Sequence, residues 1–281
     1  MKIAYVCQNY NWESFSIVRS IYETLPLYGC EVRIHHDMES IDWNPDQIWV
    51  ASSLIPLKRY DIFTVVFGLS DPNMYHRNRV EFGDLYCTAD LRISKKYGHY
   101  HFAHCGDKRY FKALSLEKKA DCIFIGTGLH NWIPERYEMV DRLRAGGLRV
   151  VVYGPNWPKH PDNLGYIKGD RLVRAYNIGS LMVDLTNRRT SLSNRIIQAS
   201  MCGTPVLTAN REDVKDLFSF DKEVFLYNGI DDLVTKAQEA LVNRTRLHQV
   251  GLAARDRSLE EHDISNRVGA LLEHIKKLKG I

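Results

Sequence analysis

The feature that most constrains the fold is a regular alternation of short β-branched runs with longer amphipathic segments. The runs KIAYVC (2–7), EVRIHH (31–36), QIWVA (47–51) and FTVVFG (63–68) have the length of strands, and the segment 13–28 has the length of a helix. This alternation is typical of parallel sheets wound by crossover helices. We therefore predict an α/β fold.

The same alternation restarts at Cys122. Further strands are predicted at 122–126, 148–154, 180–185, 204–208 and 223–227, with helices at 135–145, 170–177, 193–202, 213–218, 230–243, 244–257 and 259–279. Residues 69–105 are less periodic and stay unassigned. A chain of 281 residues is long enough for two domains. The predicted division is 1–116, 117–258 and a final helix, 259–281, which is a candidate to pack back on the first domain.

Cysteine content and hydropathy indicate the cellular compartment in which the protein is expected. The six cysteines are scattered and include no C-x-x-C pair, which favours buried reduced thiols over a disulfide framework or a zinc site. No run of 18 apolar residues occurs, so we expect no membrane span. The start, MKIAYVCQNY, lacks the apolar region and cleavage site of a signal peptide. We expect a soluble cytoplasmic protein.

Positive charge is concentrated between residues 92 and 119, although the net charge is only +4. Aromatic residues are interleaved with the cations, a pattern that suits a nucleic-acid groove. A solvated basic surface, or a site for another anionic acceptor, has the same pattern. The predicted acceptor-binding cations are Arg92, Lys95, Lys96, Lys108 and Arg109.

The segment 193–218, SNRIIQASMCGTPVLTANREDVKDLF, carries the most informative pattern. Ser193 or Ser191 can cap a helix whose first turn presents free N–H groups and Arg195. A helix N-terminus together with a guanidinium can bind a diphosphate. An ordinary helix–turn–strand unit would have the same sequence pattern.

This segment resembles the C-terminal half of GT-B glycosyltransferases, especially the CgeB-type group. That group typically reads R-v-F-E-A-l-A-c-G-x-x-l-l-T, followed by an acidic residue before L-F. The matching residues here are Arg195, Ala199, Cys202-Gly203, Thr208 and Asp216-Leu217-Phe218. Upstream, CIFIGTG (122–128) with Arg136, and VVYGPNW (151–157), resemble further motifs of the group. The likeness spans roughly residues 60–275 and is strongest over 122–245.

The resemblance implies a GT-B fold, in which two Rossmann-like domains face each other across a cleft. It also implies a glycosyltransferase, hexosyl or pentosyl, whose donor is a nucleotide-sugar, with a UDP-sugar as first candidate. No D-x-D motif has a convincing strand context, so we expect no obligatory metal. Arginine and the helix dipole would neutralise the departing diphosphate instead.

The resemblance also indicates roles within the donor site. Arg195, aided by Arg188 or Arg136, would hold the diphosphate, and Asp216, near the N-terminal part of the next helix, would lie near the sugar or its phosphate. Gln198 stands where the family has a glutamate that holds the ribose; an amide can pair with a diol without a charge-assisted bond. The full predicted donor set is Gly126, Arg136, Gly154, Trp157, Arg188, Arg189, Ser193, Arg195, Gln198 and Asp216.

In the first half, the turn Gly68-Leu69-Ser70-Asp71-Pro72 follows a predicted strand and resembles the family's x-x-D-D-P turn. Asp71 would act as general base or acceptor anchor, because ligands of open α/β sheets meet the carboxyl ends of strands. A purely structural turn before Pro72 is the alternative. His76 is the fallback base.

The acceptor is the least constrained part of the prediction. The opening MKIA and a later VASS (50–53) faintly resemble phage enzymes that glucosylate hydroxymethylated DNA bases. This resemblance makes double-stranded DNA the first candidate partner. A phage-encoded enzyme would act in the cytoplasm of the host. A CgeB-like enzyme acting on a cell-surface, protein or small-molecule acceptor is the second. Substitution of glutamine for glutamate at Gln198 also keeps open a catalytically inactive nucleotide-binding module. A nucleotide-sugar epimerase is the rival enzyme, although such epimerases are usually longer.

Overall fold

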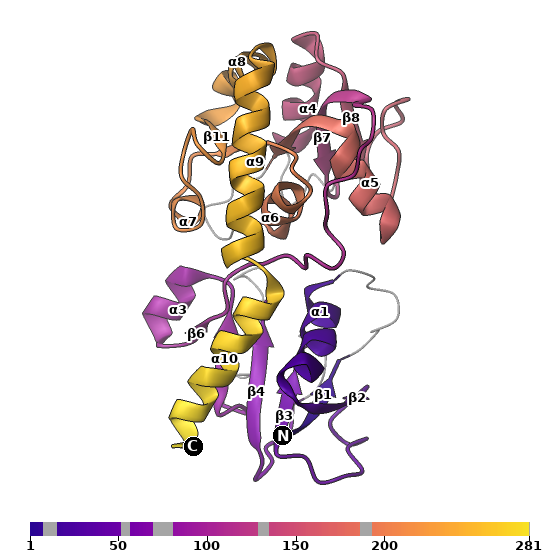
Figure 1. Cartoon of the computed structure of the whole chain (residues 1–281). Helices are drawn as coiled ribbons and strands as arrows, with labels where there is room; N and C mark the ends of the chain where they lie inside the picture. Colours follow the sequence, from indigo (N-terminus) through magenta and orange to yellow (C-terminus); the bar gives the residue numbers. More distant parts are fainter. Residues whose placement is uncertain (8–15, 52–56, 70–80, 129–134, 186–192, 281) are drawn as a thin grey trace. The chain divides into compact units, whose positions relative to one another are not determined.

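The computed structural model describes the chain except for residues 8–15, 52–56, 70–80, 129–134, 186–192 and 281. The chain forms two compact units (Figure 1). Unit 1 consists of Met1–His104 and Ile264–Ile281, and unit 2 of Cys105–Asp263. Residues 105–116 therefore lie in unit 2, whereas the sequence-based division placed 1–116 in the first domain. Packing explains this, because Phe111 contacts Tyr176 and Leu114 N–H donates to Asn177 Oδ1 at 2.7 Å.

Unit 1 is built on a parallel sheet with the strand order β2-β1-β3-β4-β5-β6. The strands are β1 (Lys2–Val6), β2 (Glu31–His35), β3 (Gln47–Val50), β4 (Phe63–Gly68), β5 (Leu85–Thr88) and β6 (Tyr100–His101). Strands β3 and β5 are buried at every position, as expected of strands in a parallel sheet covered on both faces. The predicted strands of the first half are confirmed.

The described helices of unit 1 are α1 (Ile17–Thr24), extended by the 3₁₀ turn η1 (Leu25–Tyr28), α3 (Leu91–Tyr97) and α10 (Ile264–Lys279). Ser16 caps α1 by accepting from Arg19 N–H. Gly29, at φ 73°, ends η1 in the left-handed conformation that glycine tolerates best. Helices α1 and α10 pack together, and Tyr28 Oη donates to the Ser265 carbonyl at 2.7 Å.

Unit 2 is built on a second parallel sheet, with the order β11-β10-β9-β7-β8. Its strands are β7 (Ala120–Ile125), β8 (Val150–Tyr153), β9 (Gly179–Asp184), β10 (Val206–Ala209) and β11 (Phe225–Tyr227). The first strand, β7, lies between β8 and β9, so the chain winds first to one side of β7 and then to the other. In open α/β sheets this reversal marks the point where ligands bind, beyond the carboxyl ends of the strands.

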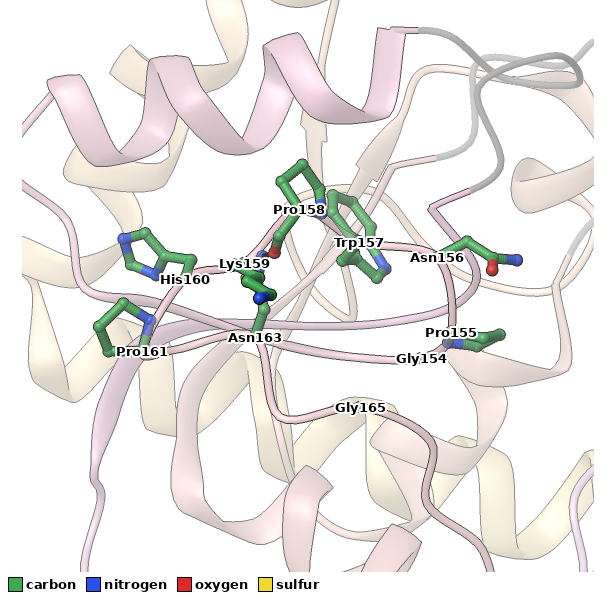
Figure 2. Close-up of a pocket in the computed structure, with 10 residues that line it drawn as sticks. All are labelled: Gly154, Pro155, Asn156, Trp157, Pro158, Lys159, His160, Pro161, Asn163 and Gly165. Atoms are coloured by element: carbon green, nitrogen blue, oxygen red, sulfur yellow. Dashed lines mark hydrogen bonds between the residues drawn. The ribbon is translucent and has the colours of Figure 1, made fainter.

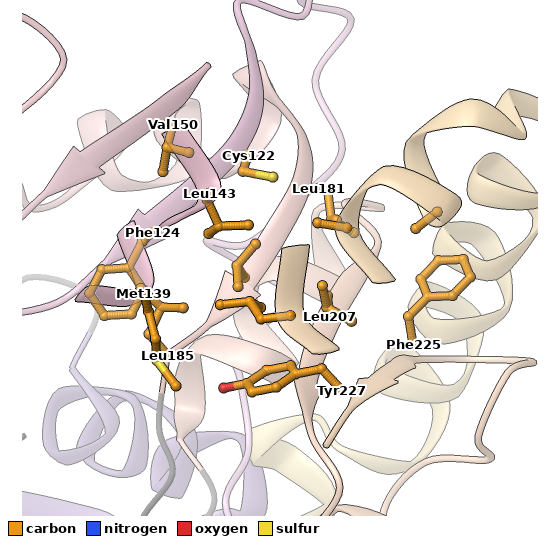
Figure 3. Close-up of a cluster of buried hydrophobic side chains, with 14 of the residues drawn as sticks. Cys122, Phe124, Met139, Leu143, Val150, Leu181, Leu185, Leu207, Phe225 and Tyr227 are labelled. Carbon is orange, nitrogen blue, oxygen red and sulfur yellow. The ribbon is translucent and has the colours of Figure 1, made fainter. Parts of the chain in front are cut away.

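The described helices of unit 2 are α4 (Glu135–Ala145), α5 (Asp170–Ile178), α6 (Asn194–Met201), α7 (Glu212–Lys215), α8 (Gly229–Val242) and α9 (Arg244–Glu261). Helix α4 contacts α8, and α6 contacts α9. Figure 3 shows the core between α4, α8 and the sheet, where Phe124, Leu143, Leu181 and Leu207 are fully buried. No helix among the described residues has both the length and the apolar composition needed to cross a bilayer.

Candidate functional site

The candidate site lies in unit 2 at the carboxyl ends of β7 and β9, the two strands on either side of the topological reversal. Strand β7 leads into Gly126, and β9 ends on Asp184. Because the two strands are parallel neighbours, these ends lie at the same edge of the sheet. Side chains from α4, α6 and the residues after β10 converge there.

Asp184 is a fully buried carboxylate at the centre of this edge. Thr208 Oγ1 donates to its Oδ2 at 3.3 Å. Two guanidinium groups reach it: Arg195 Nη2 lies 3.6 Å from Oδ1, and Arg211 Nη2 lies 3.9 Å from Oδ2. Tyr227 Oη donates to the Asp184 backbone carbonyl at 2.9 Å. A buried charge requires this kind of pairing and hydrogen bonding.

Arg195 is presented by the first turn of α6, whose N-cap is Ser193. The Ser193 hydroxyl accepts from Arg195 N–H at 3.2 Å. The Arg195 guanidinium lies over the Phe124 ring, 5.5 Å from its centroid. A Cβ atom at Gly126 would lie 3.3 Å from Arg195 Nη1, so the bare backbone after β7 passes close to the guanidinium. The structure thus brings together three predicted donor-site residues: Gly126, Ser193 and Arg195.

Arg136 has a different environment. It is buried, and its Nε donates to the Leu185 carbonyl at 3.1 Å while Nη1 donates to the Thr127 carbonyl at 2.7 Å. These carbonyls follow β9 and β7, so Arg136 ties the two strand ends together. The guanidinium also lies over Phe124, 5.2 Å from the ring centroid. Its direct contact with a diphosphate stays a prediction.

The loop after β8 is held against the loop after β7. Trp157 Nε1 donates to the Gly126 carbonyl at 2.8 Å, and the Trp157 ring packs edge-on against Phe124. Gly154 has φ 142°, and a Cβ there would lie only 2.0 Å from the Gly126 carbonyl oxygen. Only glycine fits this close approach.

A cavity of about 590 Å³ opens beside this loop (Figure 2). It is lined by residues 154–161, with Asn163 and Gly165. Asn163 Nδ2 donates to the Pro158 carbonyl at 2.7 Å, which closes the loop on itself. Two predicted donor-site residues, Gly154 and Trp157, therefore line this cavity and also lie against Gly126.

Gln198 lies one helical turn beyond Arg195 on α6 and is half-buried. Its Oε1 accepts a hydrogen bond from the hydroxyl of Tyr176 at 2.9 Å. Burial raises the pKa of the Tyr176 phenol well above its ordinary value, while the nearby Arg195 lowers it. Gln198 thus belongs to the same polar cluster as Arg195.

The prediction for the position of Asp216 is wrong. The predicted helix 213–218 is the shorter α7, and Asp216 is the exposed residue that ends it, not one near its start. Arg211 is the N-cap residue of α7. A carboxylate at a helix C-terminus does not benefit from the helix dipole. The contact of Asp216 with a sugar or phosphate stays a prediction.

Three residues of the cluster, Asp184, Arg211 and Tyr176, are absent from the donor set predicted from sequence. One signal was available: Asp184 is a charged residue that ends a strand of buried apolar residues. Such a residue lies at the ligand-binding edge of a parallel sheet. Four other predicted residues, Asp71, His76, Arg188 and Arg189, lie outside the described residues and stay predictions.

The predicted acceptor-binding cations are divided between the two units. Arg92, Lys95 and Lys96 belong to α3 of unit 1, and Lys108 and Arg109 belong to unit 2. Lys95 and Lys96 lie in the last turn of α3, where positive charge favours the helix C-terminus.

Three of these cations form ion pairs with aspartate side chains. Arg92 pairs with Asp90 at 2.9 Å. Arg109 pairs with Asp107 at 2.7 Å, and Lys108 lies 3.4 Å from Asp263. Asp90, Asp107 and Asp263 are all buried, so each cation compensates a buried carboxylate. Less free positive charge is therefore available to a polyanion than the sequence suggested.

Within the part of the chain that the structure describes, no three His, Cys, Asp or Glu side chains are grouped so as to hold a metal ion. The expectation that the reaction needs no metal stays a prediction.

Residues 136–273 match a family model described as "Glycosyl transferase-like". The match includes Asp184, Arg195, Gln198 and Arg211, and therefore most of the cluster just described. The second half of the chain is therefore similar to glycosyltransferases. A search of curated protein sequences finds no significant match.

Solved structures establish the fold of the chain. Sucrose-phosphate synthase from Thermosynechococcus elongatus aligns with a TM-score of 0.73 at 10% identity, over 100% of this chain and 99% of that one. HepE of Anabaena in complex with UDP-glucose aligns with a TM-score of 0.71 at 12% identity, over 99% and 100%. AviGT4, a glycosyltransferase involved in avilamycin A biosynthesis, aligns with a TM-score of 0.71 at 15% identity, over 100% and 99%. The predicted GT-B fold is confirmed, and the CgeB-type assignment stays a prediction.

Proposed function

We propose that this protein is a glycosyltransferase, which binds a UDP-linked sugar at the carboxyl ends of β7 and β9 and transfers the sugar to an acceptor hydroxyl. The observation that carries the proposal is the position of Arg195, on the first turn of α6 and beside the glycine that follows β7. The structures of HepE with UDP and with UDP-glucose support a UDP-linked donor.

In this proposal the diphosphate lies between Gly126 and the first turn of α6. The positive end of the α6 helix dipole and the Arg195 guanidinium would neutralise the charge that develops as the sugar leaves. Asp184 holds the Arg195 guanidinium in place, because the buried Asp184 carboxylate has no access to solvent and must remain paired. Arg211, the second guanidinium at Asp184, adds positive charge at the same edge.

The nucleoside would follow the diphosphate, with the ribose first and the base beyond it. The ribose would contact Gln198, one turn further along α6. The base would enter the cavity beside Trp157, whose indole N–H is already used by the Gly126 carbonyl and which therefore offers its ring surface. Aromatic surfaces and backbone groups are common contacts of planar bases in such pockets.

The acceptor side of the proposal rests on the sequence. Asp71, or His76 in its place, would take the proton of the acceptor hydroxyl. A hydroxymethylated pyrimidine in double-stranded DNA is the first acceptor candidate, and cell-surface, protein or small-molecule hydroxyls are the others. The pairing of Arg92, Lys108 and Arg109 with buried carboxylates weakens the electrostatic argument for DNA.

The donor site is tested by replacing Arg195 with alanine. We expect UDP binding, measured by calorimetry, to weaken and turnover to fall by about 10²–10³-fold, the usual loss when one preorganised donor to a developing charge is removed. Arg195→Lys should restore part of the affinity, because it keeps the charge but loses the two-pronged geometry. Arg149→Ala, which removes an exposed guanidinium paired with Asp162, is the matched control. Unchanged turnover in the Arg195→Ala enzyme would remove the assignment.

The acceptor is tested by mass spectrometry after incubation with a panel of nucleotide-sugars and acceptors, hydroxymethylcytosine DNA included. For DNA, affinity must also fall steeply as salt rises, because phosphate contacts release counterions. UDP released only in the presence of an acceptor identifies a transferase. UDP binding with no release for any donor would instead support the inactive-module alternative.

A further inference from the structure

The side-chain amide of Gln198 has its oxygen in a hydrogen bond, whereas its nitrogen can still donate. Its Oε1 accepts from the Tyr176 hydroxyl at 2.9 Å. Among the residues that the structure describes, no side chain or backbone group pairs with its Nε2. Since Gln198 is half-buried and lies one turn beyond Arg195, these two N–H groups can donate to solvent or to a ligand bound beside Arg195.

The direction of the amide follows from the burial of Tyr176. The Tyr176 side chain is fully buried, and burial raises the pKa of its phenol, so the hydroxyl keeps its proton and must donate it. Within the described chain, Gln198 Oε1 is the acceptor that receives this proton. With the amide turned over, an N–H would face the hydroxyl, and the phenolic proton would be left buried without an acceptor.

Tyr176 itself is held firmly. Its ring packs edge-on against the buried Phe111, with 6.1 Å between centroids. Its backbone carbonyl accepts from Thr204 Oγ1 at 2.7 Å, a bond that ties the end of α5 to the turn after α6. The hydroxyl therefore has one position relative to α6, and the Gln198 amide has one orientation.

We propose that Tyr176 is a positioning residue that makes Gln198 a hydrogen-bond donor, and not an acceptor, toward the ribose of the nucleotide-sugar. This inference rests on the proposed function, which places the ribose at Gln198. A carboxylate at this position would accept the protons of the ribose hydroxyls. The amide held by Tyr176 instead donates to the lone pairs of the hydroxyl oxygens. Binding then depends on the presence of the ribose oxygen and not on the hydroxyl proton.

The test compares UDP with 2′-O-methyl-UDP and 3′-O-methyl-UDP, in which a hydroxyl oxygen is kept and its proton removed. Calorimetry gives, for each variant, the ratio of the Kd for the methylated nucleotide to the Kd for UDP. In the wild type this ratio reflects the bulk of the methyl group alone. In Gln198→Glu we expect it to rise about tenfold for at least one of the two positions, because a charge-assisted bond to the ribose proton is then lost on methylation.

Tyr176→Phe frees the amide to turn its oxygen toward the ligand, so we expect its ratio to rise about threefold or more above the wild-type value. Tyr5→Phe is the matched control: Tyr5 is fully buried in unit 1, and its hydroxyl donates to the Val18 carbonyl at 2.7 Å. This control loses a buried hydroxyl and should keep the wild-type ratio. Comparing ratios also cancels any general loss of affinity that a variant suffers.

Equal ratios in the wild type, Gln198→Glu and Tyr176→Phe, with UDP still bound, would overturn the role of Tyr176 and leave the donor site intact. Failure of the wild type to bind UDP, or UDP binding that Arg195→Ala leaves unchanged, would overturn the proposed donor site and this inference with it.

Discussion

Replacement of Asp184 by asparagine should destabilise unit 2 strongly, although the ion pairs that it makes are long. The carboxylate is fully buried, with Arg195 Nη2 at 3.6 Å and Arg211 Nη2 at 3.9 Å. Asparagine keeps the size of the side chain and an oxygen for the Thr208 hydroxyl. It removes the negative charge and turns an N–H₂ group toward a guanidinium.

The magnitude follows from the geometry. At an effective dielectric constant of about 20, a pair of unit charges near 3.6 Å attracts by roughly 4 to 5 kcal/mol. The cost of desolvating Asp184 cancels much of this in the wild type, but the variant removes the buried carboxylate from both guanidinium groups, although Arg211 Nε keeps Asp213 Oδ1 at 3.2 Å. Breaking a buried pair typically costs about 3 to 5 kcal/mol, and the partial exposure of Arg195 argues for the lower end. For a protein of this size that corresponds to about 6 to 12 °C in Tm.

The assay is thermal and urea unfolding of the wild type, Asp184→Asn and a control with the same charge change. Asp221→Asn provides that control, because Arg246 Nη2 lies 3.5 Å from Asp221 Oδ1, nearly the same distance, but the two side chains are 52% and 74% exposed. Surface pairs of this kind contribute little, so Tm should change by no more than ~2 °C. Equal Tm values for the two variants would refute the argument that burial, and not distance, sets the strength of the Asp184 cluster.

Two further predictions concern a glycine and a histidine. Gly154→Ala should lower Tm and weaken UDP binding, because the new Cβ would lie 2.0 Å from the Gly126 carbonyl oxygen. The control is Gly147→Ala, which is also at positive φ but has no atom within 4 Å of the new Cβ, so it should cost only the ~1 kcal/mol of an unfavourable backbone conformation. Equal losses of Tm in the two variants would contradict the steric argument. Burial lowers the pKa of His99, so NMR should show its imidazole titrating below 6.5. The unfolded state then binds this proton more readily than the folded state does. The free energy that neutral His99 contributes to folding is therefore fully present above pH 6.5 and is lost as the pH falls through the folded-state pKa. A His99 pKa at or above 6.5 would contradict this prediction.

Much of the secondary structure was predictable because its signals are local. Runs such as VVVY in β8 are buried at every position, and their composition alone predicts a strand. The Ser193 cap of α6 and the Gly29 end of η1 were also recognisable, since each acts on neighbouring residues. The segment 69–105 was less predictable because β6 has only two residues, too few for any period to appear.

The candidate site was predictable in part. Ser193, Arg195 and Gln198 could be identified because they lie on one short helix and its cap, within a segment that resembles a family motif. Their partners could not, because Asp184 and Tyr176 come from other elements of the chain. The hydrogen bonds of Arg136 to two backbone carbonyls could not be predicted either, because they join the ends of two strands that are distant in the chain.

By itself, the sequence determined where strands and helices form and which helix presents Arg195, because periodicity and capping depend on residues within a few positions of each other. Only the tertiary structure decided that Asp184 lies between two guanidinium groups and that Tyr176 orients the Gln198 amide. Those contacts depend on the order in which strands pair, and on the need of each buried polar group to find a partner wherever in the chain that partner lies.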